Sequence, residues 1–302
     1  MEHTTIAPEV AAALAAGGPV VALESTIITH GLPRPDNLAL ARDLEAAVRA
    51  AGALPATIAV LDGQVRIGLG AADLPRLARA DVAKLSVRDL APAVASGRSG
   101  GTTVAATAHL AHRAGIRVFA TGGLGGVHGA GLDGSQWDVS ADLEALARAP
   151  IAVVCAGMKS ILDIPATLER LETLGVAVVG YGTDEVPGFY LRTTGLPCPW
   201  RVDSPDEAAA ILEANAALGV SSAVLFLNPV PRADALDPAA HEAALAGALA
   251  AAAGAGVIGA ELTPFLLAHL QQATGGAALG ANIALARSNV EVAARIAVAL
   301  TA

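Results

Sequence analysis

Short apolar runs that alternate with helical patterns constrain the fold of this 302-residue chain more than any other feature. Each run is continuous and rich in small or β-branched residues, which is typical of a strand buried on both faces of a sheet. Such strands are expected at residues 19–23, 117–121, 151–155, 177–181 and 223–227. The alternation predicts an α/β fold, a three-layer α/β/α sandwich with a mostly parallel central sheet.

One hairpin makes the predicted sheet mixed. Residues 57–61 and 65–69 are apolar strand patterns joined by an Asp-Gly pair, which favours the tight turn of an antiparallel hairpin. A further short strand is predicted at residues 82–86, and it carries Lys84. A lysine inside a short strand usually faces solvent, so a structural interpretation of Lys84 stays open beside a functional one.

Helices account for most of the remaining chain. Asp36 or Asn37 is expected to cap a helix that reaches about residue 51. The last third predicts three helices, at residues 238–253, 264–273 and 279–300. No polar linker, low-complexity run or block of charge divides the chain, so residues 1–302 are expected to form a single domain.

Composition and charge restrict the partners. The chain is 54% hydrophobic but only 3% aromatic, so its core is expected to consist of Ala, Val, Leu and Ile. The net charge is −9 and no Lys/Arg cluster is present, which argues against a nucleic-acid polymer as partner. A small phosphorylated ligand remains compatible, because a helix N-terminus and one or two lysines suffice to bind a phosphate.

Cysteine content and hydropathy indicate a cytoplasmic protein. The two cysteines, Cys155 and Cys198, form no disulfide framework and no metal-binding spacing, so a reducing cytoplasm is expected. The N-terminus lacks the basic region of a signal peptide. Residues 243–260 are uncharged but almost entirely Ala and Gly, which predicts a helix ending near residues 254–256 rather than a membrane span.

Lys159 is the first candidate catalytic residue. It follows the apolar run at residues 151–155, in a turn that precedes a helix capped by Asp163. The carboxyl ends of the strands are the usual ligand site of an open α/β sheet. A lysine partly desolvated there more readily provides the neutral amine that a Schiff-base nucleophile requires. The alternative is a solvated lysine at a strand-helix turn.

Glu24 is the second candidate, because it places a carboxylate directly after the apolar run at residues 19–23. Burial of a glutamate is unfavourable unless the side chain is paired or protonated, so its position requires an explanation. From the residues alone, a catalytic and a structural role are equally compatible with this position.

Glycine-rich loops and a cluster of polar residues provide weaker signals. Residues 99–103 place glycines and hydroxyls before a helix, and residues 122–126 contain four glycines, but neither matches a P-loop or a dinucleotide-binding motif. Asp138, Ser140 and Asp142 crowd a helix start. Ser140 or Asp142 suits an N-cap, whereas Asp138 suits the single carboxylate of a Mg²⁺ or Mn²⁺ site.

Two asparagines lie seven residues apart on the last predicted helix. Asn282 and Asn289 therefore share nearly one face of that helix. An asparagine on an inner face requires hydrogen-bond partners, and a ligand is one candidate partner.

Several motifs in a fixed order resemble the pseudouridine-5′-phosphate glycosidase family, also called indigoidine synthase A-like. They are Leu23-Glu-Ser-Thr-Ile-Ile, Lys84-Leu-Ser-Val-Arg-Asp-Leu, Gly101-Thr-Thr-Val-Ala, Phe119-Ala-Thr-Gly-Gly-Leu-Gly-Gly-Val-His, Asp138-Val-Ser-Ala-Asp-Leu, Val153-Val-Cys-Ala-Gly-Met-Lys-Ser-Ile-Leu-Asp and Ala281-Asn-Ile-Ala-Leu. The resemblance extends from about residue 6 to residue 300. It implies a homotrimeric α/β/α enzyme with one divalent Mn²⁺ per subunit. The implied reaction is reversible cleavage of the C1′–C5 bond of pseudouridine 5′-phosphate into uracil and ribose 5-phosphate.

The resemblance also implies roles for particular residues. Lys159 matches the nucleophile, Glu24 the proton donor and Asp138 the metal ligand. Lys84, Val104, Ser140, Ala141 and Asp142 match substrate-binding positions. Asn282 is also predicted to bind substrate, from its place on the last helix. The loop at residues 129–136 is longer than is usual in the family, which leaves the role of His128 open.

The chemistry of the implied reaction agrees with these residues. Uracil C5 is a carbon and must be protonated on the ring, which two carboxylates alone do poorly. Capture of C1′ of a ring-opened ribose by Lys159 lets an imine nitrogen carry the charge while an acid protonates the base. The alternative enzyme is another Schiff-base lyase acting on a phosphosugar. A nucleotide-binding regulator is a third hypothesis, but such a protein gains little from an activated amine.

Overall fold

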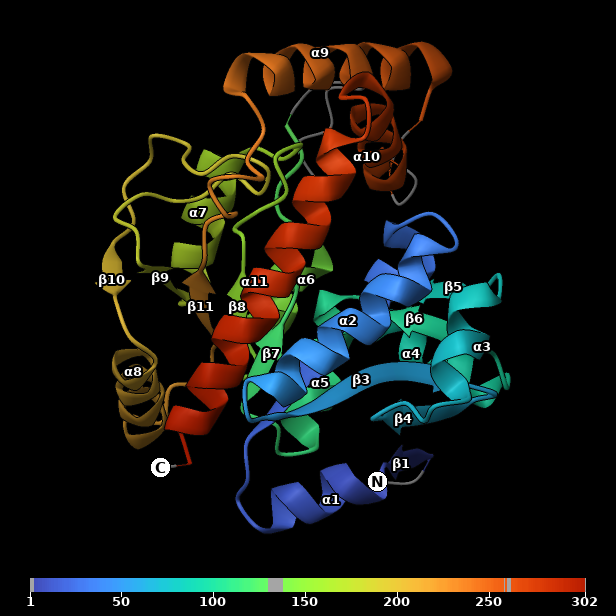
Figure 1. The fold of residues 1–302 in the computed structure, drawn as a ribbon, viewed down its shortest axis with the longest axis vertical. Coiled ribbons are helices and arrows are strands. Elements are labelled where there is room, and N and C mark those ends of the chain that lie inside the picture. The colour runs from blue at the N-terminus through green and yellow to red at the C-terminus, as the bar shows by residue number, and fades with distance from the viewer. Residues whose placement is uncertain (1–2, 130–137, 258, 260–261, 302) are drawn as a thin grey trace.

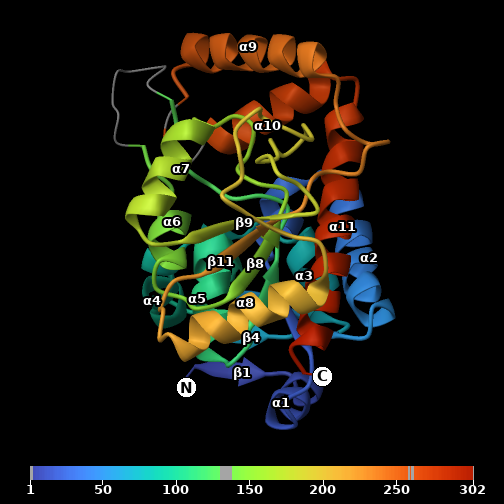
Figure 2. The ribbon, with the colours of Figure 1, turned by 90° about the vertical axis from the view of Figure 1, so that its left-hand side faces the viewer.

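The computed structural model describes residues 3–129, 138–257, 259 and 262–301. Its centre is a mixed, mostly parallel sheet covered by helices on both faces, as the alternating pattern predicts (Figures 1 and 2). Helices α2 (Asp36–Ala50) and α11 (Ala277–Ala299) lie on one face, and α4 (Val87–Ala95), α5 (Val104–Arg113), α6 (Ala141–Leu146) and α7 (Ile164–Thr173) lie on the other (Figure 2). Helix α8 (Pro205–Ala217) packs against α11. Most of the predicted loop at residues 129–136 lies outside the described residues.

The strands are short and follow one another from the N-terminus to residue 227. Their bounds are Thr4–Ile6 (β1), Val20–Leu23 (β2), Leu54–Leu61 (β3), Gln64–Ile67 (β4), Ala83–Leu85 (β5), Gly100–Thr102 (β6), Val118–Ala120 (β7), Ala152–Cys155 (β8), Ala177–Tyr181 (β9), Trp200–Val202 (β10) and Val224–Leu227 (β11). Their order is β1-β4-β3-β2-β7-β8-β11-β9-β10, while β6 pairs with β3 and β5. Among the named strands of the described residues, the pairs β3–β4 and β3–β6 are antiparallel and the others are parallel.

The helices include one short π-helix near the N-terminus. The π-helix spans Ile27–Gly31, and the α-helices span Pro8–Ala15 (α1), Asp36–Ala50 (α2), Asp73–Arg79 (α3), Val87–Ala95 (α4), Val104–Arg113 (α5), Ala141–Leu146 (α6), Ile164–Thr173 (α7), Pro205–Ala217 (α8), Pro238–Ala255 (α9), Leu262–Ala273 (α10) and Ala277–Ala299 (α11). In the part of the chain that the structure describes, no helix is both long and apolar enough to span a membrane.

The predicted hairpin is confirmed. Val60 pairs with Val65 in the antiparallel β3–β4 ladder. Asp62 and Gly63 both have positive φ, at 50° and 72°, as a two-residue hairpin turn of this kind requires. A Cβ at Gly63 would also lie 2.7 Å from the carbonyl oxygen of Val94, so both conformation and space favour glycine there.

The predicted cap of α2 is wrong. Pro35 occupies the N-cap and no side chain caps the helix. Asn37 is instead buried inside the first turn, where its Nδ2 donates to the carbonyl oxygens of Ile28 (2.8 Å) and Ala78 (2.9 Å). The Asn37 side-chain amide therefore links α2 to the π-helix and to α3. These tertiary hydrogen bonds take the place of the predicted N-cap.

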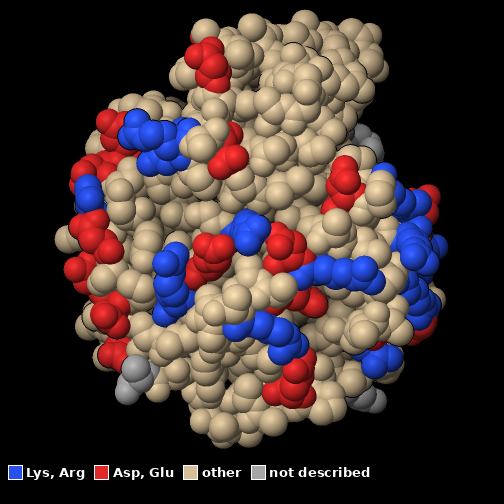
Figure 3. Space-filling model, in the orientation of Figure 1, with Lys and Arg blue, Asp and Glu red and all other residues tan. Residues whose placement is uncertain are grey.

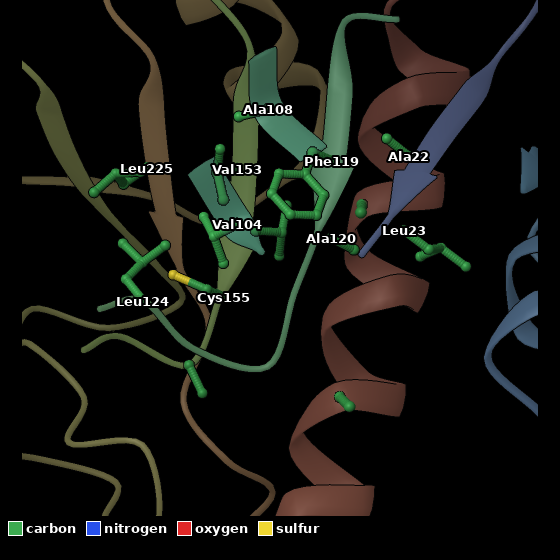
Figure 4. Close-up of a cluster of buried hydrophobic side chains, with 14 of the residues drawn as sticks. Ala22, Leu23, Val104, Ala108, Phe119, Ala120, Leu124, Val153, Cys155 and Leu225 are labelled. Carbon is green, nitrogen blue, oxygen red and sulfur yellow. The ribbon is translucent and has the colours of Figure 1, made fainter. Parts of the chain in front are cut away.

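The core is built from small aliphatic side chains, as the composition predicts. Phe119 is buried at its centre, with Ala108, Val153 and Leu225 among the neighbouring core side chains (Figure 4). α11 packs directly across β2, β7 and β8 and also contacts α2 and α8. Alanines on its inner face, such as Ala293 and Ala294, allow this close approach between helix and sheet.

Candidate active site

Three neighbouring parallel strands bring the candidate residues together. Glu24 follows β2, Thr121 follows β7, and the turn that carries Lys159 follows β8. Because β2, β7 and β8 are adjacent and parallel, these residues meet at one carboxyl edge of the sheet. α10 lies over this edge and contributes Thr263 to the same cavities.

The turn that carries Lys159 is held by backbone hydrogen bonds to the glycine-rich loop at residues 122–126. The Lys159 amide donates to the Leu124 carbonyl at 3.0 Å, and the Leu124 amide donates to the Gly157 carbonyl at 3.0 Å. On the other side, Ser160 Oγ lies 2.7 Å from His241 Nε2 of α9, and both residues are buried. The predicted cap at Asp163 is confirmed, since its carboxylate accepts from the Ala166 amide at 3.0 Å.

Glu24 has a hydrogen-bond donor at each carboxylate oxygen. Thr121 Oγ1 donates to Oε1, and Thr26 Oγ1 donates to Oε2. Burial raises the pKa of Glu24 above its usual 4.5, although the charge of Lys159 and the two hydroxyls act in the opposite direction. A carboxyl that retains its proton more readily than usual suits a general acid.

Glu24 and Lys159 line two adjoining cavities. The larger has a volume of about 840 Å³ and is more polar than the smaller. Its lining includes Lys84, Arg88 and Asp138, together with the first residues of α4 and α5. Helix N-termini and basic side chains favour an anion, so this cavity suits a phosphorylated ligand.

The smaller cavity is more apolar and has a volume of about 70 Å³. Ile27, Phe189 and Leu267 provide apolar walls, and Asn282 provides an amide. Phe189 has a positive φ of 62°. A Cβ at Gly123 would lie 2.5 Å from Phe189 Cδ2, so the glycine leaves the space that the ring occupies.

The structure brings all nine predicted site residues to these two cavities. Asn282 lines the smaller cavity, Glu24, Lys84 and Lys159 line both, and the larger cavity also contains Val104, Asp138, Ser140, Ala141 and Asp142. The side chain of Val104 is buried in the core.

Two of these residues also have structural roles. Ser140 is the N-cap of α6, as the sequence predicts, and accepts from the Asp142 amide at 3.2 Å. The Asp142 carboxylate accepts one backbone amide at each oxygen, from Ala105 and Gly125, both at 2.9 Å. It therefore connects α6 to α5 and to the glycine-rich loop.

Comparison with known proteins identifies the family. Residues 9–299 match the model of the indigoidine synthase A like proteins. The chain belongs to the indigoidine synthase A like family. Among its relatives are pseudouridine-5′-phosphate glycosidases of Streptomyces griseus subsp. griseus and Herpetosiphon aurantiacus. The first is 59% identical over 97% of this chain and 91% of the relative, and the second is 54% identical over 99% of both.

Solved structures agree with this assignment to the indigoidine synthase A like family. The crystal structure of the prealnumycin C-glycosynthase AlnA in complex with ribulose 5-phosphate matches with a TM-score of 0.91 and 40% identity. An indigoidine synthase A-like protein from Thermotoga maritima matches with a TM-score of 0.89 and 35% identity. Both matches cover 100% of this chain and 98% of the solved chain.

The side chains present fit a hydrated divalent cation rather than a closed metal site. Within residues 3–129, 138–257, 259 and 262–301, no group of three His, Cys, Asp or Glu side chains is arranged to hold a metal. Asp138 lines the large cavity beside His128, whose pKa is lowered mainly by burial and raised in part by the Asp138 charge. A carboxylate such as Asp138, facing a roomy cavity, suits Mn²⁺, which retains much of its water and needs few protein ligands.

Sequence reasoning missed three site features of this member of the indigoidine synthase A like family. They are the two hydroxyls on Glu24 and the apolar wall formed by Phe189. Thr26 and Thr121 stand in motifs that resemble those of the family, but no local pattern indicates which carboxylate a hydroxyl contacts. Asn289 also has partners other than a ligand, since its Nδ2 donates to the carbonyls of Thr121 (2.8 Å) and Gly122 (3.2 Å).

Proposed function

We propose that this protein cleaves the C1′–C5 bond of pseudouridine 5′-phosphate into uracil and ribose 5-phosphate through an imine on Lys159. The observation that carries the proposal is the position of Glu24 and Lys159, which line both the larger, more polar cavity and the smaller, more apolar one. A bond that spans the junction of the cavities would meet the nucleophile and the acid together. The names of the relatives, pseudouridine-5′-phosphate glycosidases, support this substrate.

The larger cavity suits the phosphosugar. Its volume of about 840 Å³ lies within the usual range of ligand pockets, about 300–1,000 Å³. We assign the phosphate to the N-termini of α4 and α5, with Lys84 and Arg88 as basic side chains. A neighbour of this fold, the AlnA C-glycosynthase, was solved with ribulose 5-phosphate, a ligand of the same class.

The smaller cavity suits the base. Phe189 provides an aromatic surface, and the Asn282 amide provides one donor and one acceptor group for a pyrimidine edge. This cavity is also what favours the glycosidase over an aldolase-like lyase on a phosphosugar. A lyase of that kind has no use for an apolar, amide-lined cavity beside the lysine.

The residues then act in sequence. Lys159 Nζ attacks C1′, the C1′–O4′ bond breaks so that the ribose ring opens, and O4′ takes up the proton that the amine gives up. Glu24 protonates uracil C5, the C1′–C5 bond breaks, and its electron pair restores the conjugated uracil ring while C1′ becomes an imine. Water hydrolyses this imine, which releases ribose 5-phosphate and regenerates the amine. One water is therefore consumed in each cleavage.

We assign a divalent cation, Mn²⁺, to Asp138. When bound, such an ion supplies positive charge that neutralises and orients anionic groups of the substrate. The expected homotrimer and cytoplasmic location follow from the family resemblance and from the cysteine content, and they stay predictions. On the face shown in Figure 3, basic and acidic side chains are interspersed, which supports a small ligand rather than a nucleic-acid polymer.

Borohydride trapping with ribose 5-phosphate tests the proposal. We expect a reduced adduct on the peptide that contains Lys159, detected by mass spectrometry, and uracil release from pseudouridine 5′-phosphate. Lys159→Ala should fold, as judged by circular dichroism, but show neither. Lys84→Ala is the matched control, because it removes the other lysine of both cavities and should still give the Lys159 adduct at high sugar phosphate. Uracil release by folded Lys159→Ala would exclude the imine.

A further inference from the structure

Thr121 contacts the proposed acid from behind the cavities. Its side chain is 4% exposed, and it is not among the described residues that line either cavity. Its Oγ1 donates to Glu24 Oε1. Thr26, in contrast, lines both cavities, so its hydroxyl is accessible to a ligand as well as to Glu24. Any effect of the Thr121 hydroxyl on the reaction is therefore exerted through Glu24, whereas Thr26 can also contact a ligand directly.

The backbone of Thr121 is anchored on two sides. Its amide donates to the Val154 carbonyl at 3.0 Å, and its carbonyl accepts from Asn289 Nδ2 of α11 at 2.8 Å. Asn289 is fully buried, and its Oδ1 accepts from Asn228 Nδ2 at 3.0 Å. A buried network thus extends from the end of β11 through α11 to the hydroxyl on Glu24. Such a network restricts where the Thr121 side chain can point.

Two hydroxyls on separate oxygens restrict the rotation of the Glu24 carboxyl group. Each carboxyl oxygen keeps further hydrogen-bonding capacity, so the acidic proton can still be directed towards the cavities. Among the described residues, the charges that act most on Glu24 are those of Lys159, from the turn after β8, and Asp142, from α6. Lys84 and His30 line the same cavities as Glu24. The Lys159 backbone and the Asp142 carboxylate are held by the hydrogen bonds described above.

We infer that Thr121 is a positioning residue for the reaction, which holds the Glu24 carboxyl so that its proton meets the base at the junction of the two cavities. The inference rests on the proposed function, because it assumes that Glu24 is the acid. Loss of the hydroxyl should slow the cleavage of pseudouridine 5′-phosphate by about 10-fold to 100-fold, a part of the roughly 10²–10⁴-fold effect of a general acid. Imine formation between Lys159 and ribose 5-phosphate should change little.

The pH profile provides a readout that a purely structural role would leave unchanged. A rate that depends on a general acid falls as pH rises through the pKa of that acid. The Thr121 hydroxyl favours the ionised form of Glu24 and lowers its pKa. Thr121→Val should therefore move the alkaline limb of the kcat profile to higher pH, whereas Thr121→Ser keeps the hydroxyl and should restore both the limb and the rate.

The chain contains a matched control. Thr57 Oγ1 donates to Glu45 Oε1 at 2.6 Å, and Thr57 is 2% exposed, but neither residue lines the cavities. Thr57→Val removes the same kind of buried Thr–Glu hydrogen bond and should leave the rate and the pH limb unchanged. Thr121→Ala, which adds no methyl group in place of the hydroxyl, is measured beside Thr121→Val in case the latter does not fold.

Each result separates the hypotheses. A folded Thr121→Val or Thr121→Ala variant with the wild-type cleavage rate and the wild-type alkaline limb would overturn the inference. Equal losses of trapping and cleavage, or the same shift in Thr57→Val, would also overturn it, because the hydroxyl would then not act through Glu24. Wild-type protein that releases no uracil would instead refute the proposed function.

Discussion

At the scale of single residues, the burial of Glu24 connects catalysis with stability. Since its pKa is raised above 4.5 in the folded protein, the folded state binds the proton more tightly than the unfolded state. Wild-type stability should therefore fall as pH rises from about 4.5 through the raised pKa, and the loss is complete above it.

Glu24→Gln should remove the loss of stability that the wild-type protein shows as pH rises. We expect the urea midpoint of the variant to exceed that of wild type at about pH 8, and the difference to shrink as the pH is lowered towards 4.5. Circular dichroism during urea titration at several pH values measures it. A variant that is less stable than wild type at pH 8 would show that the two threonine hydroxyls outweigh the burial of the charge.

A second prediction at this scale concerns Asp138. Chelator should abolish uracil release, and added Mn²⁺ should restore it. In the absence of substrate, Asp138→Asn should bind Mn²⁺ at least about 10-fold more weakly than wild type, as measured by titration calorimetry. Asp234→Asn changes an exposed carboxylate outside both cavities and should bind as wild type does. Full turnover in metal-free protein would contradict the role of the ion.

The catalytic candidates could be predicted because each follows an apolar strand. Lys159 and Glu24 come directly after the carboxyl ends of parallel strands, and ligands usually bind at that edge of an open α/β sheet. The hydroxyl of Thr121 could not be assigned to Glu24, since the two residues are 97 positions apart and only the pairing of β2 with β7 brings them together. Phe189 comes from a loop with no pattern of its own.

At the scale of elements, Asp142 joins α6 to the start of α5. Both carboxylate oxygens accept backbone amides, so an asparagine at this position would direct its NH₂ at one of the two N–H groups. We expect Asp142→Asn to lower the free energy of unfolding by about 1–3 kcal/mol, the cost of leaving a buried donor unpaired.

Asp163→Asn is the control for this loss. Asp163 accepts a single amide as the N-cap of α7, and asparagine caps helices about as well as aspartate. Urea unfolding should therefore separate the two variants, with a change of only a few tenths of a kcal/mol for Asp163→Asn. An equal effect of both substitutions would mean that the Asp142 contacts contribute no more than an ordinary cap.

Element boundaries were predictable where the signal is local. The cap at Asp163 and the left-handed Gly256 after α9 follow from single residues and their neighbours. The strands β1, β6 and β10 and the helix α4 were not predicted. Each of these strands has three residues and β6 contains two glycines, so their extended conformation depends on partners distant in the sequence.

At the scale of the whole molecule, the layers follow from the alternation of strands and helices, but the strand order does not. Parallel strands have no turn between them that specifies a neighbour, so nothing local shows that β11 lies between β8 and β9. The position of α10 over the carboxyl edge, where Thr263 lines both cavities and Leu267 lines the smaller one, is likewise a result of tertiary packing.

The central place of α11 has a consequence for how the protein is made. The ribosome delivers the chain from its N-terminus, and β2, β7 and β8 emerge long before residues 277–299. Until α11 emerges, one face of these three strands lacks its cover, and Asn289 is not yet present to anchor Thr121. The nascent chain thus exposes these apolar strands from their own synthesis until that of α11, and the acid of the site is fully anchored only after residues 277–299 have been made.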